Sequence, residues 1–439
     1  MRALVRSSKS AFLSDKGNIM KTFTGFEYLL IDLANAYGLD KLTFEKRIEW
    51  AEAHLPLLES CLGAAENPPL FYKAMTAIRK AQQGIPTGHL VGFDAACSGM
   101  QIMSVLMGCE AGAAATGLIH QDVRSDAYSS VTQAINQLLS AEGLAGVQVS
   151  RKQAKSATMT SLYGSTRQPK LIFGEDTPEL KAFFEAMKIV APGAWELLHI
   201  LLASWQDMAL SHEWELPDGF QAKIKVMDTV ESRVEVDELG HSTFTYQYRE
   251  NTGLPAGHHK AKSNAANVVH SIDAYVLRSI HRRCNYDFNE IDDARMLVST
   301  MLTTRALSNG QPVEASNKRI ARYIRLWEET GMADVVIAPH LTPATVMMLP
   351  TKMLQQLEGI MFSMLEHKPF EVVTIHDEFK CHANNMNHLR QHYNNILAEL
   401  ANSTVLDSIL SQIHGQKGTV TKRSADLASK IRNANYALC

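Results

Sequence analysis

The sequence has few cysteines, no low-complexity tract and no internal repeat. Its six cysteines, at positions 61, 97, 109, 284, 381 and 439, form no CxxC pair and no regular framework. This spacing argues against both a zinc site and a disulfide scaffold. Because unpaired thiols suit a reducing compartment, we expect the protein in the cytoplasm.

Long uninterrupted hydrophobic runs are also missing. The basic segment MRALVRSSKSAFLSDKG has no apolar core of signal length, and the apolar stretch at 182–205 is broken by Glu185, Lys188 and Glu196. We therefore expect no export signal, no membrane span and no membrane partner.

A surplus of positive charge is absent as well. The 439 residues include 43 Lys and Arg against 46 Asp and Glu, a formal net charge of −3, and 46% are hydrophobic. This is an ordinary globular composition, long enough for two or three packed lobes. Since nucleic-acid-binding proteins usually carry a basic surplus, such a role must rest on local patches or on a partner's charge.

Hydrophobic periodicity predicts a mixed α/β (α+β) fold that is mostly helical. Helical patterns fill the region from Gly25 to about Gln83, with Thr43 as an N-cap. The run HLVGFDAACSGMQ predicts a short strand that ends at Asp94 and is followed by a helix. The segment FEVVTIHDEFKC predicts a strand, a polar turn at His376 and Asp377, and a returning strand.

Between these segments the pattern changes twice. From about 215 to 250 the hydrophobic period becomes two, which predicts a long hairpin turning near Gly240. The stretch NVVHSIDAYVLRSIHRR predicts a helix. The region 284–369 has a mixed pattern that does not point to any particular function.

The stretch SRKQAKSATMTSLYGS, residues 150–165, predicts a helix with one chemically distinctive stripe. The stripe consists of residues spaced four apart, Arg151, Lys155, Met159 and Tyr163, and Gly164 follows it. In a helix these residues share one face and the stripe is roughly 18 Å long. One interpretation is a solvated basic helix with a glycine C-cap. The other is a row of cations for a triphosphate with a base stacked at its end.

Two strand-end carboxylates favour the second interpretation. Asp94 and Asp377 each follow an apolar strand, and two carboxylates brought together there would repel unless divalent cations lay between them. Two such ions can stabilise the attacking and leaving oxygens of an in-line phosphoryl transfer. Arg151 would then grip phosphate oxygens, and Lys155 could also protonate the departing pyrophosphate.

These segments resemble a known family. FDAACSGMQ, RKQAKSATMTSLYG and TIHDEF are similar to motifs A, B and C of the single-subunit DNA-directed RNA polymerases of bacteriophages and mitochondria, and PDGF at 217–220 and NVVHSIDA at 267–274 also match. The resemblance implies a right-handed palm-and-fingers fold that lacks most of the N-terminal domain and thumb. It implies DNA-templated RNA synthesis from NTPs by a two-metal mechanism.

The resemblance also assigns roles to residues. Asp94 and Asp377 would bind two Mg²⁺ ions, with the carbonyl of Ala95 as an extra ligand. Arg151 and Lys155 would hold the triphosphate, and Asp94, Asp377 and Lys155 would be the catalytic groups. The remaining expected substrate contacts are Tyr163, Gly164, Met159, His270, Tyr128 and His376.

Further segments can be placed by the same resemblance. The hairpin at 232–249 falls where the family has its promoter-reading loop, and the terminal NYALC resembles its C-terminal foot. The expected parts are 1–83, N-terminal helices and partner docking; 84–130, palm with motif A; 131–215, fingers with motif B; 216–255, the hairpin; 256–283, the NVVHSID helix; 284–369, an insertion; and 370–439, palm with motif C.

The sequence disfavours two alternatives to RNA synthesis. DNA polymerases of the same superfamily share motifs B and C, but they place a glutamate five residues after the metal-binding aspartate to block a ribose hydroxyl. Here that position is Gly99, and CSG with Gln101 is the RNA-polymerase version. A non-catalytic scaffold subunit would be expected to lose Asp94, Asp377 or Lys155, and all three are present.

The sequence departs from the family pattern before motif A, because only 93 residues precede Asp94. This suggests the split form found in some phages, in which a second subunit carries the N-terminal domain and thumb. The expected partners are then DNA template, nascent RNA, NTPs and that subunit, in the cytoplasm of an infected bacterial cell. A single-stranded-DNA-binding activator is a further candidate partner.

Overall fold

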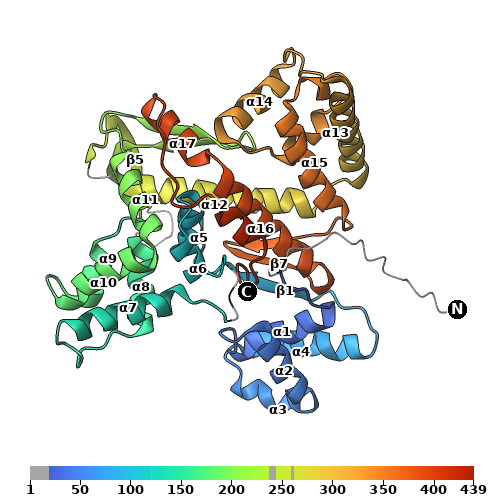
Figure 1. Ribbon diagram of the computed structural model, residues 1–439. Coiled ribbons are helices and arrows are strands. Elements are labelled where there is room, and N and C mark those ends of the chain that lie inside the picture. Colours follow the sequence, from blue (N-terminus) through green and yellow to red (C-terminus); the bar gives the residue numbers. More distant parts are fainter. Residues whose placement is uncertain (1–18, 120, 122, 237–243, 259–261) are drawn as a thin grey trace.

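The computed structural model describes residues 19–119, 121, 123–236, 244–258 and 262–439. It is mostly helical and contains small antiparallel sheets, as the hydrophobic patterns predict (Figure 1).

The N-terminal helices pack beneath the central strands (Figure 1). Thr43 caps α2 by accepting a hydrogen bond from the backbone N–H of Lys46, so the predicted cap is confirmed. The elements are α1 (Gly25–Tyr37), α2 (Phe44–His54), α3 (Leu58–Cys61) and α4 (Pro68–Gln82).

A three-stranded antiparallel sheet places the two expected strand ends side by side. β1 (Leu90–Asp94) pairs with β7 (Glu378–His382), which also pairs with β6 (Val373–Ile375). Asp94 lies opposite Glu378, and the two-residue turn between β6 and β7 consists of His376 and Asp377. The predicted strand, polar turn and returning strand are therefore confirmed.

The segment after β1 is fixed by burial. In α5 (Ser98–Leu106) every side chain from Met100 to Leu106 is buried, so the helix lies inside the main hydrophobic core. α16 (Met386–Asn402) and α12 (Lys262–Cys284) both pack on it. The backbone that carries Asp94 therefore leads directly into a helix that is held in place by the hydrophobic core.

The second helical group follows α6 (Glu110–Ala115). It comprises α7 (Ala127–Ala141), α8 (Arg151–Ser161), α9 (Arg167–Phe173), α10 (Pro178–Val190) and α11 (Pro192–Ala203). Ser150 and Gln153 form a reciprocal capping box at the start of α8. The helix ends just before Tyr163, and Gly164 follows with φ +82°.

Among the described residues, no single helix has the length and apolar character needed to cross a bilayer. α10 and α11 pass that test only as a pair, and they meet at a bend of 105°. Their buried side chains, which include Phe183 and Leu201, belong to the main hydrophobic core.

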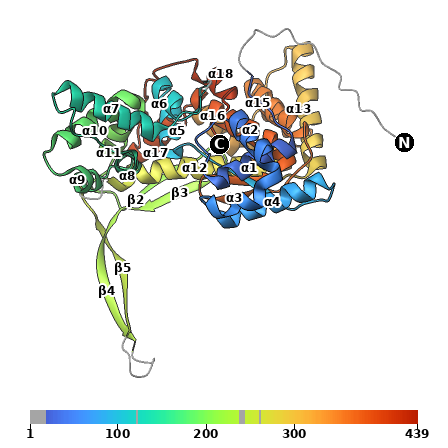
Figure 2. The same ribbon diagram turned by 90° about the horizontal axis from the view of Figure 1, so that it is seen from below.

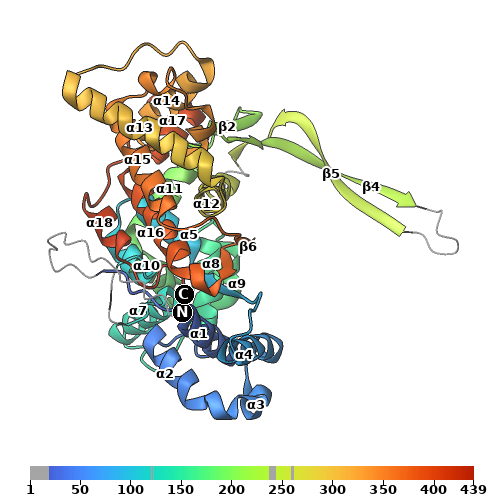
Figure 3. The ribbon, with the colours of Figure 1, turned by 90° about the vertical axis from the view of Figure 1, so that its right-hand side faces the viewer.

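The stretch predicted as one hairpin contains two. β2 (Ser211–Glu215) pairs with β3 (Gln221–Lys225), and β4 (Met227–Val236) pairs with β5 (Phe244–Pro255). The β4–β5 hairpin projects far from the rest of the protein (Figures 2 and 3). The turn predicted near Gly240 lies outside the described residues.

Residues 286–367 form a helical lobe, called here the α13–α15 lobe. It contains α13 (Phe288–Ser308), α14 (Lys318–Thr330) and α15 (Thr351–Leu365), and it has a hydrophobic core of its own. Its two ends meet: the hydroxyl of Tyr286 donates to the carbonyls of Met364 and His367, and the N–H of Phe370 donates to the carbonyl of Cys284. The chain then continues through β6, β7, α16, α17 (Val405–His414) and α18 (Leu427–Arg432).

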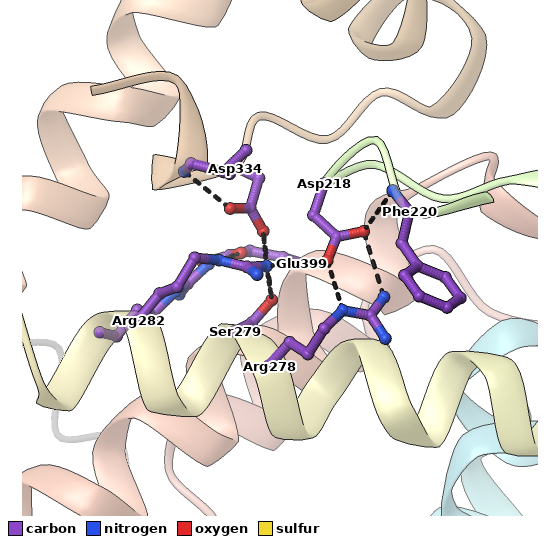
Figure 4. A network of polar contacts seen from close by, with 9 residues as sticks. Asp218, Phe220, Arg278, Ser279, Arg282, Asp334 and Glu399 are labelled. Atoms are coloured by element: carbon purple, nitrogen blue, oxygen red, sulfur yellow. Dashed lines mark hydrogen bonds and ion pairs between the residues drawn. The ribbon is translucent and has the colours of Figure 1, made fainter. Parts of the chain in front are cut away.

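An ion-pair network joins this lobe to the central helix α12 (Figure 4). Asp218, in the PDGF turn between β2 and β3, accepts hydrogen bonds from Arg278 at 2.7 Å and from Arg282 at 3.1 Å. Arg282 also reaches Asp334 of the lobe at 3.0 Å. Since Asp218 and Asp334 are buried, their charges need these partners.

Candidate active site

One large cleft, with a volume of about 880 Å³, contains much of the expected site. Its walls come from the N-terminal helices, the ends of β1 and β7, and α7 and α8. The expected residues that line it are Asp94, Ala95, Asp377, Arg151, Lys155, Met159 and Tyr128. Residues from separate parts of the sequence therefore converge as the motifs predict.

The carboxylates of Asp94 and Asp377 lie on adjoining backbone segments. The N–H of Ala95 donates to the carbonyl of Asp377 at 3.1 Å, and the carbonyl of Asp94 accepts from the N–H of Cys439 at 3.1 Å. Burial raises the pKa of the Asp94 carboxyl, and the nearby charges of Glu378 and Asp377 raise it further. The free site thus disfavours a full set of negative charges.

The chemistry of this donor set fits Mg²⁺. Among the described residues, no cluster of three or more His, Cys, Asp or Glu side chains is arranged to bind a metal. Mg²⁺ does not need such a cluster, because it is commonly bound by one or two carboxylates, several waters and the phosphates of a substrate. Asp94, Asp377 and the Ala95 carbonyl supply oxygen ligands of this kind.

The two expected cations also line the cleft. The guanidinium of Arg151 and the ammonium of Lys155 each lie 5.6 Å from the centre of the Tyr128 ring. Arg151 is also held by Asp126, through Nε to Oδ2 at 2.6 Å and Nη2 to Oδ1 at 3.1 Å. The phosphate-binding role predicted for these cations is compatible with their place on the cleft.

Tyr163 and His270 form a second aromatic group. The Tyr163 ring is 4.9 Å from the ring of His270, and a Cβ atom on Gly99 would lie only 2.6 Å from the Tyr163 hydroxyl oxygen. Burial raises the pKa of Tyr163 to about 12, and the negative charges of Asp273 and Asp377 act in the same direction. The hydroxyl therefore stays protonated and packs where Gly99 has no side chain.

Four expected substrate contacts do not line the cleft itself. Tyr163 is partly buried and Gly164 buried just after α8, His270 is exposed on α12, and His376 is exposed in the turn beside Asp377. The backbone of His376 has φ +56°, a left-handed conformation that costs energy for a residue other than glycine. Their roles stay predictions.

The sequence interpretation missed three residues near this site. Asp126 pairs with Arg151, and the chain's last residue, Cys439, lines the cleft and donates to the end of β1. Asp273 lies one turn after His270, and its pKa is raised to about 6 by burial and by the charge of Asp377. Only the pattern SDAY, typical of a helix N-cap, could have drawn attention to Asp126.

Comparisons with known proteins find similar polymerases. The family model described as DNA-dependent RNA polymerase matches residues 21–170. The chain is 23% identical over 339 residues to the DNA-directed RNA polymerase of Enterobacteria phage T3, which covers 58% of this chain and 38% of that protein. It is 22% identical over 337 residues to the T7 RNA polymerase of Escherichia phage T7, with the same coverage of each.

The chain is thus similar to phage-type RNA polymerases, and residues 21–170 carry the match to the family model. A mitochondrial relative, the DNA-directed RNA polymerase 1B of Nicotiana tabacum, is 27% identical over 177 residues, which are 33% of this chain and 17% of that protein. The region shared with the phage polymerases is 38% of their length. The resemblance to phage-type RNA polymerases is therefore confirmed, and the matched region contains motifs A and B.

Proposed function

We propose that this chain carries the nucleotidyl-transfer centre of a DNA-directed RNA polymerase, which joins NTPs to the 3′ end of RNA on a DNA template. One observation carries the proposal: Asp94, at the end of β1, and Asp377, in the turn before β7, line the same cleft as Arg151 and Lys155. Acidic metal ligands and phosphate-binding cations in one cleft are what nucleotidyl transfer from a triphosphate requires.

Asp94 and Asp377, with the carbonyl of Ala95, would hold two Mg²⁺ ions. When bound, such ions stabilise charge on the attacking and leaving oxygens of the transfer. Burial, and then repulsion from Glu378 and Asp377, raise the pKa of the Asp94 carboxyl, and bound divalent cations would offset both effects.

The protein's own cations act on the other end of the nucleotide. Arg151 binds oxygens of the triphosphate through its planar guanidinium, and Lys155 donates a proton from Nζ to the departing pyrophosphate. Met159, Gly164 and His376 would bound the nucleotide, with the Tyr163 and His270 rings beside its base and sugar. The Tyr128 ring, 5.6 Å from each cation, would help to orient both.

The choice of RNA over DNA synthesis is supported by Gly99. A side chain at this position would displace the Tyr163 hydroxyl, so the residue that would block a ribose hydroxyl in a DNA polymerase has no room here. Single-nucleotide extension of an RNA primer on a DNA template, with NTPs and dNTPs in parallel, tests this choice. Preferred use of dNTPs would favour the DNA polymerase alternative.

A second polypeptide carrying an N-terminal domain and thumb remains part of the proposal. The described N-terminal helical region exposes apolar side chains that a partner could cover, including Leu57 at 61% and Tyr72 at 55%. Transcript length on a primed template should then depend on the partner, most strongly at high salt. If the chain alone made long transcripts at physiological salt and the partner changed nothing, the two-subunit proposal would be wrong.

A further inference from the structure

The guanidinium of Arg151 is already engaged by one carboxylate within the cleft. Asp126 binds it side-on, with Nε to Oδ2 at 2.6 Å and Nη2 to Oδ1 at 3.1 Å. The Asp126 side chain is 18% exposed and the Arg151 side chain 38% exposed. A paired, partly buried arginine differs from the free cation that the sequence alone suggested.

The pairing leaves one edge of the guanidinium available. An arginine has five N–H donors, and Asp126 takes the one on Nε and one of the two on Nη2. Three donors remain, both on Nη1 and one on Nη2, and no hydrogen bond from them is formed within the described part of the chain. These donors form a planar fork of the kind that binds two phosphate oxygens.

Asp126 is itself rigidly placed. It is the N-cap of α7: its Oδ1 accepts from the N–H of Tyr128 at 3.2 Å and its Oδ2 from the hydroxyl of Ser129 at 2.7 Å. Partial burial favours its neutral form, but the hydrogen bonds from Arg151 and Ser129 outweigh burial and lower its pKa to about 2. It is therefore a fixed anion at every pH where nucleotidyl transfer is studied.

We propose that Asp126 is a positioning residue, which fixes the Arg151 guanidinium so that its remaining fork faces the triphosphate. The inference rests on the proposed function, in which Arg151 binds the triphosphate of an NTP. Without Asp126, the long arginine side chain would have to be ordered when the nucleotide binds, and ordering one such side chain weakens binding by about three- to tenfold. If Asp126 instead only competed with the phosphates for Arg151, its removal would strengthen triphosphate binding.

The test is the Asp126→Asn variant, because asparagine caps a helix as well as aspartate does but carries no charge. Equilibrium titration with a non-hydrolysable nucleoside triphosphate should show binding about three- to tenfold weaker than in the unmodified chain. In single-nucleotide addition, KM should rise by the same factor while kcat changes less than about twofold. Ser129→Ala, which removes a hydrogen bond to Asp126 but leaves the Arg151 pair, should bind normally.

A double-mutant cycle separates positioning from any independent effect. In an Arg151→Ala background, Asp126→Asn should cause no further loss of triphosphate binding. Tighter binding by Asp126→Asn, or an equal loss with and without Arg151, would overturn the proposal. Because the titration needs no RNA synthesis, a chain that binds triphosphate through this pair yet makes no RNA would refute the proposed function alone.

Discussion

Gly99 offers a sharp test of how the site is packed. It is the second residue of the buried helix α5, and its backbone is not in the left-handed region, so alanine can adopt its conformation. The added Cβ would lie 2.6 Å from the Tyr163 hydroxyl oxygen, whereas ordinary contact begins at 3.4 Å. The difference, 3.4 minus 2.6, means that the ring of Tyr163 must retreat by about 0.8 Å.

A displacement of this size has a larger effect on catalysis than on folding. Moving a substrate-positioning group by about 1 Å can cost about 100-fold in rate. Mild overpacking costs about 1–3 kcal/mol, and the higher helix propensity of alanine offsets up to about 1 kcal/mol of that. We therefore expect Gly99→Ala to slow single-nucleotide addition by about 10- to 100-fold while the protein remains folded.

The assay is pre-steady-state addition of one NTP, with thermal unfolding measured on the same samples. Gly359→Ala is the matched control, because a Cβ there meets no atom within 4 Å. In a Tyr163→Phe background the clashing oxygen is gone and the nearest ring atom is 3.2 Å from the new Cβ. Gly99→Ala should then cost much less, and an equal cost in both backgrounds would refute the packing argument.

Three further predictions test other parts of the protein. Lys155→Ala should slow nucleotide addition by about 10²- to 10⁴-fold, the usual contribution of a general acid. Lys152→Ala is the control and should change the rate little, because Lys152 lies off the stripe of Arg151 and Lys155. Equal effects of the two substitutions in single-turnover assays would contradict the role of Lys155. Asp218→Asn should lower the free energy of unfolding, measured in urea, by about 1.5–3 kcal/mol, because two arginines of α12 lose a charged acceptor. The control Glu185→Gln, at an exposed position, should change it by less than about 0.5 kcal/mol. The pKa of His392 lies well below 6.5, because the ring is buried and has one arginine and two histidines as neighbours. Below about pH 6.5 the unfolded chain therefore binds more protons at His392 than the folded protein does. The free energy of unfolding should then fall as the pH drops, by up to about 1.4 kcal/mol per pH unit. His392→Gln should flatten this acid dependence, and an unchanged slope would refute it.

Local patterns were sufficient for the segments that carry the motifs. The apolar run before Asp94 forms the predicted strand with Val91 and Phe93 buried. The run before Asp377 forms the short strand β6, although its Val373 and Ile375 side chains are exposed. The Ser150 cap and the Gly164 stop delimit α8 nearly where the sequence indicates. Motif spacing then placed both carboxylates and the cationic stripe on one cleft.

Contacts between distant residues were not predictable in the same way. Asp126 and Arg151 are 25 positions apart, and Cys439 reaches the end of β1 from the far end of the chain. The α13–α15 lobe has ordinary helical patterns, but its closure by Tyr286 depends on carbonyls near residue 365. Such pairs follow from tertiary packing, which one sequence does not display.

The central claim is that Asp94 and Asp377 form the catalytic centre. The most direct measurement is Mg²⁺-dependent addition of one NTP to an RNA primer on a DNA template, in the mixture where the unmodified chain is active. Asp94→Asn and Asp377→Asn should each retain no more than a few per cent of the rate, with no loss of thermal stability, since removing a repelled charge does not weaken the fold. The control Asp32→Asn, whose carboxylate lines the same cleft but pairs with His89, should stay active. Substantial activity in either of the first two variants would contradict the account.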